Sequence, residues 1–158
     1  MTQNLTMRDV LAANAVTASL DAVTKKDVLL SIAASAASAT GRDAHAVFDV
    51  LWERERLGTT GVGIGIAIPH GRVPGLDKVH GFFTRLSKPV PFESIDDKPV
   101  DLVFLLLAPE AAGADHLHAL AIVSRLLRDA KLCEKLRTAK DAEAIYRLLT
   151  ETPISQAA

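Results

Sequence analysis

Hydrophobic residues recur every three to four positions in two neighbouring stretches of the N-terminal half, which is the spacing of an amphipathic helix. The first stretch follows Thr24, whose hydroxyl can cap a helix over residues 25–39. The second follows Asp43, which can cap a helix that ends near Arg56, just before Gly58. The pattern therefore predicts two consecutive helices.

The middle of the chain changes to short apolar runs that are typical of strands. Residues 66–68 form one such run, which is cut off by Pro69 because proline cannot donate to a central ladder. Residues 80–86 form a second run, which we expect to end at the prolines just beyond it. Residues 100–107 are almost continuously apolar, which indicates a strand buried on both faces at the centre of a sheet.

The C-terminal third returns to helical spacing. Asp115 can cap a helix that runs to about Asp129. Two further helices are expected over residues 130–137 and 140–149, followed by a disordered tail over residues 152–158. The helix that follows Asp115 has one face of apolar and small residues that we expect to be buried, namely Leu117, Leu120, Ala121, Ser124 and Leu127.

The order of these elements predicts the fold class. Helices early, strands in the middle and helices late favour a layered α/β fold whose sheet is covered by helices on both faces. A short helix or turn over residues 7–11 and a brief strand over residues 15–20 are weaker expectations. With 158 residues and 49% hydrophobic content, the chain fits a single domain over residues 1–158, ordered over about residues 5–150.

Charge and composition narrow the classes of partner. The net charge is -1 and no run of Lys or Arg forms a stripe, so nucleic acid and anionic membrane surfaces are not indicated. The N-terminus lacks a signal pattern, and no apolar run approaches the ~20 residues of a membrane span. We therefore expect a cytoplasmic protein without membrane insertion. The single cysteine, Cys133, is expected to be structural.

Residues 58–72 form the most unusual stretch of the chain. Glycines and a short apolar run lead to a single histidine between Pro69 and Gly71, a pattern that core packing alone does not require. We expect His70 to lie at a strand end and to face a reaction partner, with Gly71 providing backbone freedom and room for a ligand. A G-x-G occurs at residues 61–63, but no third glycine opens a helix after it, so support for a nucleotide site is weak.

The chain has five histidines, and they differ in what they can do. We expect His45 on an exposed helix face and His80 at the start of a strand, as an edge or packed residue. His116 and His118 lie two apart on one helix and therefore point in different directions. His116 comes at the helix start, where free N–H groups favour an anion, so it is the candidate partner of His70. His118 is expected at the surface or behind the site.

Two facing histidines can hold and transfer a phosphoryl group. One neutral imidazole nitrogen attacks phosphorus while the other ring donates a hydrogen bond, and a reference pKa near 6.5 leaves imidazole largely neutral at about pH 7. A nearby arginine would offset the charge of the phosphoryl group. Arg54 and Arg56 are available at a helix end, although they can equally complement the helix dipole.

Two other uses of the histidines are less favoured. The chain has no H-x-x-x-H or H-E-x-x-H pair, and His116 and His118 with His70 lack an obvious fourth metal ligand. A Ser-His-Asp hydrolase is not indicated either, because the G-x-S-x-G elbow is missing. We therefore expect neither a metal ion nor a cofactor.

Residues 54–63 (RERLGTTGVG) and 65–71 (GIAIPHG) resemble the active-site block of enzyme IIA of the phosphoenolpyruvate-dependent phosphotransferase system, in the mannitol/fructose/nitrogen-regulatory superfamily. Residues 99–104 and the segment 115–117 with Leu120 resemble its later blocks. The resemblance extends over roughly residues 5–149. The glycine and threonine residues before the histidine are most similar to the nitrogen-regulatory branch.

The resemblance implies a mixed sheet flanked by helices and a role for specific residues. It implies that His70 accepts a phosphoryl group from the histidine phosphocarrier protein, that His116 is the second active-site histidine and that Arg54 lies near the phosphate. One position departs from the family: Ile64 stands where members often carry Asn or another polar residue, so a polar contact there is lost.

For function, the resemblance implies a phosphocarrier that regulates protein partners in nitrogen, carbon or potassium metabolism according to its phosphorylation state. The alternative within the family is a free-standing sugar-specific IIA component, of the fructose or mannitol type, that passes the phosphoryl group to a IIB domain. A third possibility is a pure protein-binding regulator whose histidine is vestigial.

Overall fold

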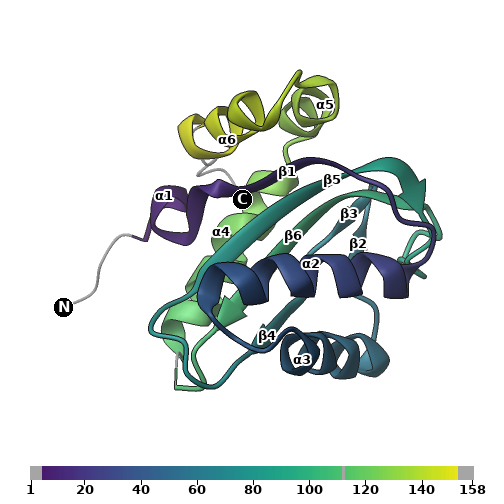
Figure 1. The fold of residues 1–158 in the computed structure, drawn as a ribbon. Coiled ribbons are helices and arrows are strands. Elements are labelled where there is room, and N and C mark those ends of the chain that lie inside the picture. Colours follow the sequence, from purple (N-terminus) through teal and green to yellow (C-terminus); the bar gives the residue numbers. More distant parts are fainter. Residues whose placement is uncertain (1–4, 112, 153–158) are drawn as a thin grey trace.

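The structure, a computed structural model, describes residues 5–111 and 113–152. The expected disordered tail lies outside the described residues except for Thr152. The elements, drawn in Figure 1, are α1 (Met7–Val10), β1 (Leu11–Leu20), α2 (Lys25–Thr40), α3 (Ala44–Leu57), β2 (Gly61–Gly63), β3 (Ile66–Ala67), β4 (His70–Arg72), β5 (His80–Val90), β6 (Val100–Ala108), α4 (Ala114–Leu127), α5 (Ala130–Thr138) and α6 (Ala142–Glu151).

The strands of the described residues form one mixed sheet in the order β1-β5-β6-β3-β2, with β4 also pairing with β6. β5 runs antiparallel to β6, whereas β3 and β4 run parallel to it. β1 is parallel to β5 and β2 is antiparallel to β3. The apolar run over residues 100–107 is therefore the central strand, as its composition predicted.

Side chains of β6 alternate between two hydrophobic cores. Leu102, Phe104 and Leu106 pack in the core that α4, α5 and α6 cover. Val103 and Leu105 pack in the core that α2 and α3 cover. Figure 1 shows α2 and α3 in front of the sheet and α4 behind it. The predicted fold class, an α/β fold with helices on both faces of a mixed sheet, is confirmed.

The predicted caps explain why the two early helices begin where they do. The Thr24 hydroxyl accepts a hydrogen bond from the amide of Asp27 at 3.1 Å, and α2 ends at Gly41 with a φ of 71°. The Asp43 carboxylate accepts from the amide of Ala46 at 2.9 Å. Both helices therefore match the prediction within a residue.

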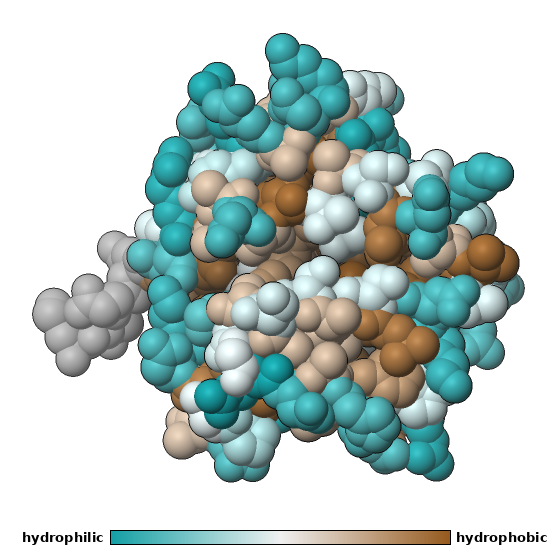
Figure 2. All heavy atoms as spheres, viewed as in Figure 1, coloured by the Kyte–Doolittle hydropathy of each residue, from teal (hydrophilic) through white to brown (hydrophobic). Residues whose placement is uncertain are grey.

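On the face seen in Figure 2, hydrophilic residues border separate small hydrophobic patches.

Two strands are longer than expected. β1 begins at Leu11 rather than at residue 15, directly after the short helix that was expected there. β5 passes Pro89 and ends at Val90, directly before Pro91, so it ends within the expected proline segment but beyond the first of the two prolines. The pairing of β5 with β6 is irregular between Arg85 and Val90, so the missing N–H of Pro89 costs no ladder hydrogen bond.

The start and the buried face of α4 also differ from the prediction. α4 begins at Ala114 after Gly113, which has a φ of 47°, so Asp115 lies inside the first turn and does not cap the helix. Leu117, expected in the core, is 67% exposed. Because α4 is apolar on more than one side, its spacing alone does not decide which side meets the sheet. The buried residues are His116, Ala119, Ile122, Val123, Leu126 and Leu127.

Within residues 5–111 and 113–152, no helix combines the length and the apolar character that crossing a bilayer demands.

Candidate active site

His70 is the first residue of the short strand β4, whereas we expected it at the end of the strand over residues 66–68. The chain stays beside β6 at Pro69, because the carbonyl of Pro69 accepts a hydrogen bond from the amide of Leu106 at 2.9 Å. His70 then pairs with the same residue in parallel register. Proline can stand here because its carbonyl, which it retains, is the group the ladder needs. The strand thus gives His70 a fixed backbone.

Gly71 has a different role from the one expected. A Cβ on Gly71 would lie 2.3 Å from Cγ1 of Val50 on α3, so the glycine allows the helix to pack directly against β4. It makes no room for a ligand, because that space is filled by α3. Since side chains alternate along a strand, His70 and Arg72 must point to the opposite face of the sheet, toward α4.

A hydrogen bond fixes the protonation pattern of His70. Its Nδ1 lies 2.8 Å from the carbonyl oxygen of Ile68. A carbonyl oxygen can only accept, so Nδ1 carries the proton of the neutral ring and Nε2 keeps its lone pair. The ring therefore offers Nε2 as its nucleophilic atom.

His116 is the residue that α4 brings to His70. The two ring centroids are 5.8 Å apart and the ring planes meet at 67°, an edge-to-face arrangement. His116 is only 7% exposed, and its Nε2 has no hydrogen-bond partner among the described residues. A buried polar atom without a partner is costly in a folded protein, so it is a sign of a missing ligand or of function.

Burial and nearby charges favour the neutral form of both rings. Burial lowers the pKa of His70, and the charge of Arg54 lowers it further, against the opposing effects of the Ile68 carbonyl and of Glu55. Burial also lowers the pKa of His116, together with the charges of His70 and Arg72. A lowered pKa favours the neutral imidazole, which is the form that can act as a nucleophile.

Two arginines bring positive charge to the pair. Arg54, in the last turn of α3, is half-buried and donates to the carbonyl of Gly58 at 2.8 Å. Arg72, which the sequence analysis missed, donates to the carbonyl of Glu110 at 3.4 Å, in the loop that leads to α4. Its position two residues after His70 was the available signal, because residues i and i+2 of a strand share a face.

Glu55, which was not predicted from the sequence, anchors the glycine-rich stretch. Its buried carboxylate accepts from the amide of Thr60 at 3.1 Å and from its hydroxyl at 2.6 Å. It also pairs with Nζ of Lys25 at 2.9 Å. The carbonyl of Thr60 in turn accepts from the amide of Ile68. Glu55 therefore connects α3 to the segment whose carbonyl holds His70.

The remaining histidines and the cysteine lie as expected. The His45 side chain is 83% exposed, His118 is exposed, and His80 begins β5 beside Asp77. Cys133 is buried and donates to the carbonyl of Leu127, and burial raises the pKa of its thiol. Among residues 5–111 and 113–152, no group of three His, Cys, Asp or Glu side chains is arranged to hold a metal ion.

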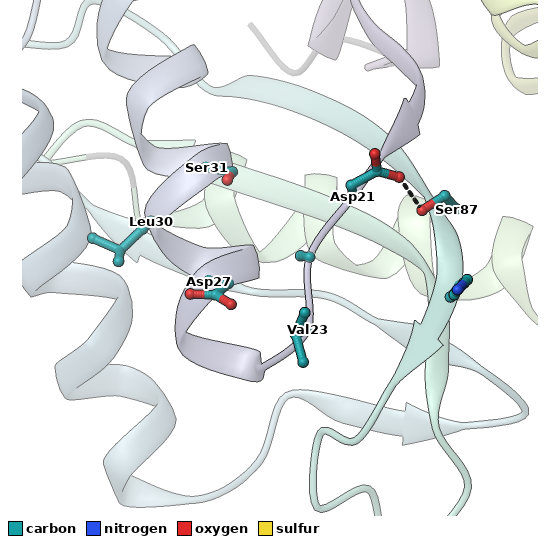
Figure 3. Close-up of a pocket in the computed structure, with 8 residues that line it drawn as sticks. Asp21, Val23, Asp27, Leu30, Ser31 and Ser87 are labelled. Carbon is teal, nitrogen blue, oxygen red and sulfur yellow. Dashed lines mark hydrogen bonds between the residues drawn. The ribbon is translucent and has the colours of Figure 1, made fainter.

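A separate hollow of about 580 Å³ lies between the end of β1 and the start of α2 (Figure 3). Its lining includes Asp21, which accepts a hydrogen bond from Ser87, and the exposed Val23. β5 begins near β4, where His80 pairs with Leu107, whereas Ser87 lies near its other end. The hollow is therefore remote from the histidine pair.

Comparisons with known proteins identify the family of this chain. The family model for the phosphoenolpyruvate-dependent sugar phosphotransferase system, EIIA 2, matches residues 9–152. A nitrogen regulatory protein of Bradyrhizobium diazoefficiens is 54% identical over 149 residues, which cover 94% of this chain and 97% of the relative. A fructose-specific EIIA component of Haloferax volcanii is 39% identical over 125 residues, covering 79% and 80%.

A solved structure shares the fold. The crystal structure of the nitrogen regulatory protein IIA-Ntr from Neisseria meningitidis superposes with a TM-score of 0.85 at 33% identity, covering 91% of this chain and 99% of that one. The family model spans nearly the whole chain, and the resemblance noted in the sequence is confirmed. The chain belongs to the EIIA type 2 family of the phosphoenolpyruvate-dependent sugar phosphotransferase system.

Proposed function

We propose that this protein is a phosphocarrier in which His70 accepts a phosphoryl group from the histidine phosphocarrier protein. The observation that carries the proposal is the pairing of His70 with His116, whose buried Nε2 has no partner within residues 5–111 and 113–152. An incoming phosphoryl oxygen would give that nitrogen its missing hydrogen bond. Binding and charge stabilisation would thus come from the same group.

The chemical step follows from the hydrogen bond to Ile68. The lone pair on Nε2 of His70 forms a new N–P bond while the N–P bond in the donor breaks, and the donor imidazole leaves with that electron pair. The proton stays on Nδ1 and remains hydrogen-bonded to the carbonyl oxygen of Ile68, so no separate base is required. Arg54 and Arg72 offset the charge on the phosphoryl oxygens, and positioning contributes the rest.

Regulation of protein partners follows from the charge that this step adds. A phosphoryl group brings about two negative charges to the surface at His70, which is enough to weaken one docking interaction and strengthen another. The identity of 54% to a nitrogen regulatory protein supports a regulatory role in nitrogen, carbon or potassium metabolism. The regulated target proteins would bind the phosphorylated and the unphosphorylated forms with different affinities.

A sugar-specific role is the second candidate. It is supported by the 39% identity to a fructose-specific EIIA component. In that role phosphorylated His70 would pass its phosphoryl group to a IIB domain. Incubating the phosphorylated protein with fructose-type and mannitol-type IIB domains distinguishes the two roles, because a regulator would keep its phosphoryl group.

Phosphorylation itself is tested by incubation with phosphoenolpyruvate, enzyme I and the histidine phosphocarrier protein. We expect an acid-labile phosphate on the wild type and none on His70→Ala, with His45→Ala as a labelled control. Full labelling of His70→Ala would contradict the proposal. Equal partner affinity of the wild type, His70→Ala and His70→Asp would favour a regulator whose histidine is vestigial.

A further inference from the structure

The turn between β2 and β3 carries an isoleucine in an unfavourable backbone conformation. Ile64 and Gly65 are its two loop residues, with φ of 52° and 82°. Positive φ at both positions is the requirement of a type I′ hairpin turn, for which Asn-Gly is the preferred pair. A β-branched side chain at positive φ is strained. An asparagine would fill this position with less strain.

The strained conformation of Ile64 does not place its side chain in the hydrophobic core. Ile64 is 52% exposed, and its neighbour Val62 is 50% exposed. The turn is held through its backbone: the amide of Ile64 donates to Asp96 at 2.9 Å, and its carbonyl accepts from Arg137 at 2.8 Å. Any residue except proline could make both hydrogen bonds at position 64. The isoleucine side chain therefore needs an explanation outside the fold.

The side chains of Val62 and Ile64 line a hollow of about 250 Å³ beside the last turns of α4. This volume is below the range of about 300–1,000 Å³ that is usual for small-molecule sites, so a single side chain of another protein fits it better. Arg128 at the hollow disfavours a basic occupant. The rest of the lining is apolar or small: Ile66, Ile68, Ser124 and Leu127.

The hollow adjoins a residue that contacts the histidine pair. Ile68, which lines it, is the residue whose carbonyl accepts the Nδ1 proton of His70. Along α4, the outward stripe between His116 and Ser124 carries the exposed Leu117 and the half-buried Leu120. A protein that reaches His70 from the α4 side would therefore cover this stripe and the hollow.

We propose that Ile64 is a docking residue, and that with Val62 it receives an apolar side chain of the protein that delivers the phosphoryl group to His70. This inference rests on the proposed function, since the occupant is the phosphoryl donor. The strained turn is retained because an apolar side chain at this position binds the donor, at the expense of some stability.

The test compares Ile64→Asn with the wild type in two measurements: phosphorylation rate against concentration of phosphorylated histidine phosphocarrier protein, and thermal unfolding of the unphosphorylated protein. We expect Ile64→Asn to raise the donor KM about 5- to 10-fold with kcat unchanged, because an apolar contact is lost. We expect the same change to raise Tm by about 2–4 °C, because strain is relieved. A purely structural residue would not give these opposite effects.

Two control variants complete the test. Ile64→Val keeps an apolar β-branched side chain and should retain both the donor KM and the Tm of the wild type. Val23→Asn removes an apolar side chain that is even more exposed than Ile64 from the remote hollow of Figure 3 and should leave the donor KM unchanged.

Several outcomes would overturn the docking role. These are an unchanged donor KM in Ile64→Asn, a fall in its Tm accompanying a raised KM, or an equal rise of KM in Val23→Asn. A wild type that accepts no phosphoryl group at all would overturn the proposed function as well. A labelled wild type with an unaffected Ile64→Asn variant would overturn the docking role alone.

Discussion

The two faces of β4 are built for opposite purposes. Toward α3, Gly71 lets Val50 approach so closely that even a methyl group would clash. Toward α4, His70 faces a buried histidine whose Nε2 has no partner among the described residues. The tightly packed face holds the strand in place. The opposite face can therefore present the Nε2 atom of His116 to a ligand.

Glu55→Ala should have the largest effect on the packed face. It leaves Lys25 and the amide of Thr60 without their buried carboxylate, which we expect to lower the free energy of unfolding by about 3 kcal/mol. Urea unfolding measures this. Glu53→Ala is the matched control, because its exposed ion pair with Arg56 should contribute less than about 0.5 kcal/mol. Equal losses in both variants would contradict the anchoring role of Glu55.

His116→Ala tests the open face. The Nε2 atom of His116 makes no hydrogen bond among the described residues that this substitution could remove. The free energy of unfolding should therefore fall by less than in Glu55→Ala. The rate of phosphoryl transfer should fall about 100-fold, because a donor to the phosphoryl oxygens is removed. Transfer kinetics of the exposed His118→Ala variant provide the comparison. An unchanged rate in His116→Ala would remove His116 from the site.

Gly71→Ala should destabilise the protein through the packed face. The added methyl group would clash with Val50, and overpacking of this kind costs about 2 kcal/mol of unfolding free energy. The double variant Gly71→Ala/Val50→Ala provides space for the methyl group and should recover part of the loss. If the single variant were as stable as the wild type, the close packing of α3 on β4 would be wrong.

The smallest expected effect is a pH dependence of stability. The pKa values of His70 and His116 are lowered in the folded protein, so as the pH falls below about 6.5 the unfolded chain binds protons that the folded chain does not. The free energy of unfolding should therefore decrease with falling pH in this window. Urea unfolding between about pH 7.5 and 5.5 should show a weaker decrease for His116→Ala. An identical slope would contradict the lowered pKa of His116.

Elements with local signals could be predicted from the sequence. Thr24 and Asp43 cap α2 and α3 through amides three residues away, and the apolar run of β6 is recognisable by itself. The buried face of α4 could not be predicted, because Leu117 and His116 lie on two faces that both look suitable for packing. The path of β5 through Pro89 depends on an irregular pairing that only the neighbouring strand determines.

The residues of the candidate site also differ in whether the sequence alone could predict them. His70 and His116 could be named from short motifs, because a histidine between proline and glycine and a histidine at a helix start carry local signals. Arg54 was named from the family resemblance. The roles of Glu55 and Gly71 depend on contacts with Lys25 and Val50, which are distant in sequence, and no local pattern announces them.

The most direct test of the account is to identify the phosphorylated atom. The hydrogen bond from Nδ1 of His70 to the carbonyl of Ile68 leaves Nε2 as the nucleophile. NMR spectroscopy of the phosphorylated, isotope-labelled protein distinguishes the two ring nitrogens. We predict a phosphoryl group on Nε2 of His70 and on no other residue. A phosphoryl group on Nδ1, or on another side chain, would contradict the account.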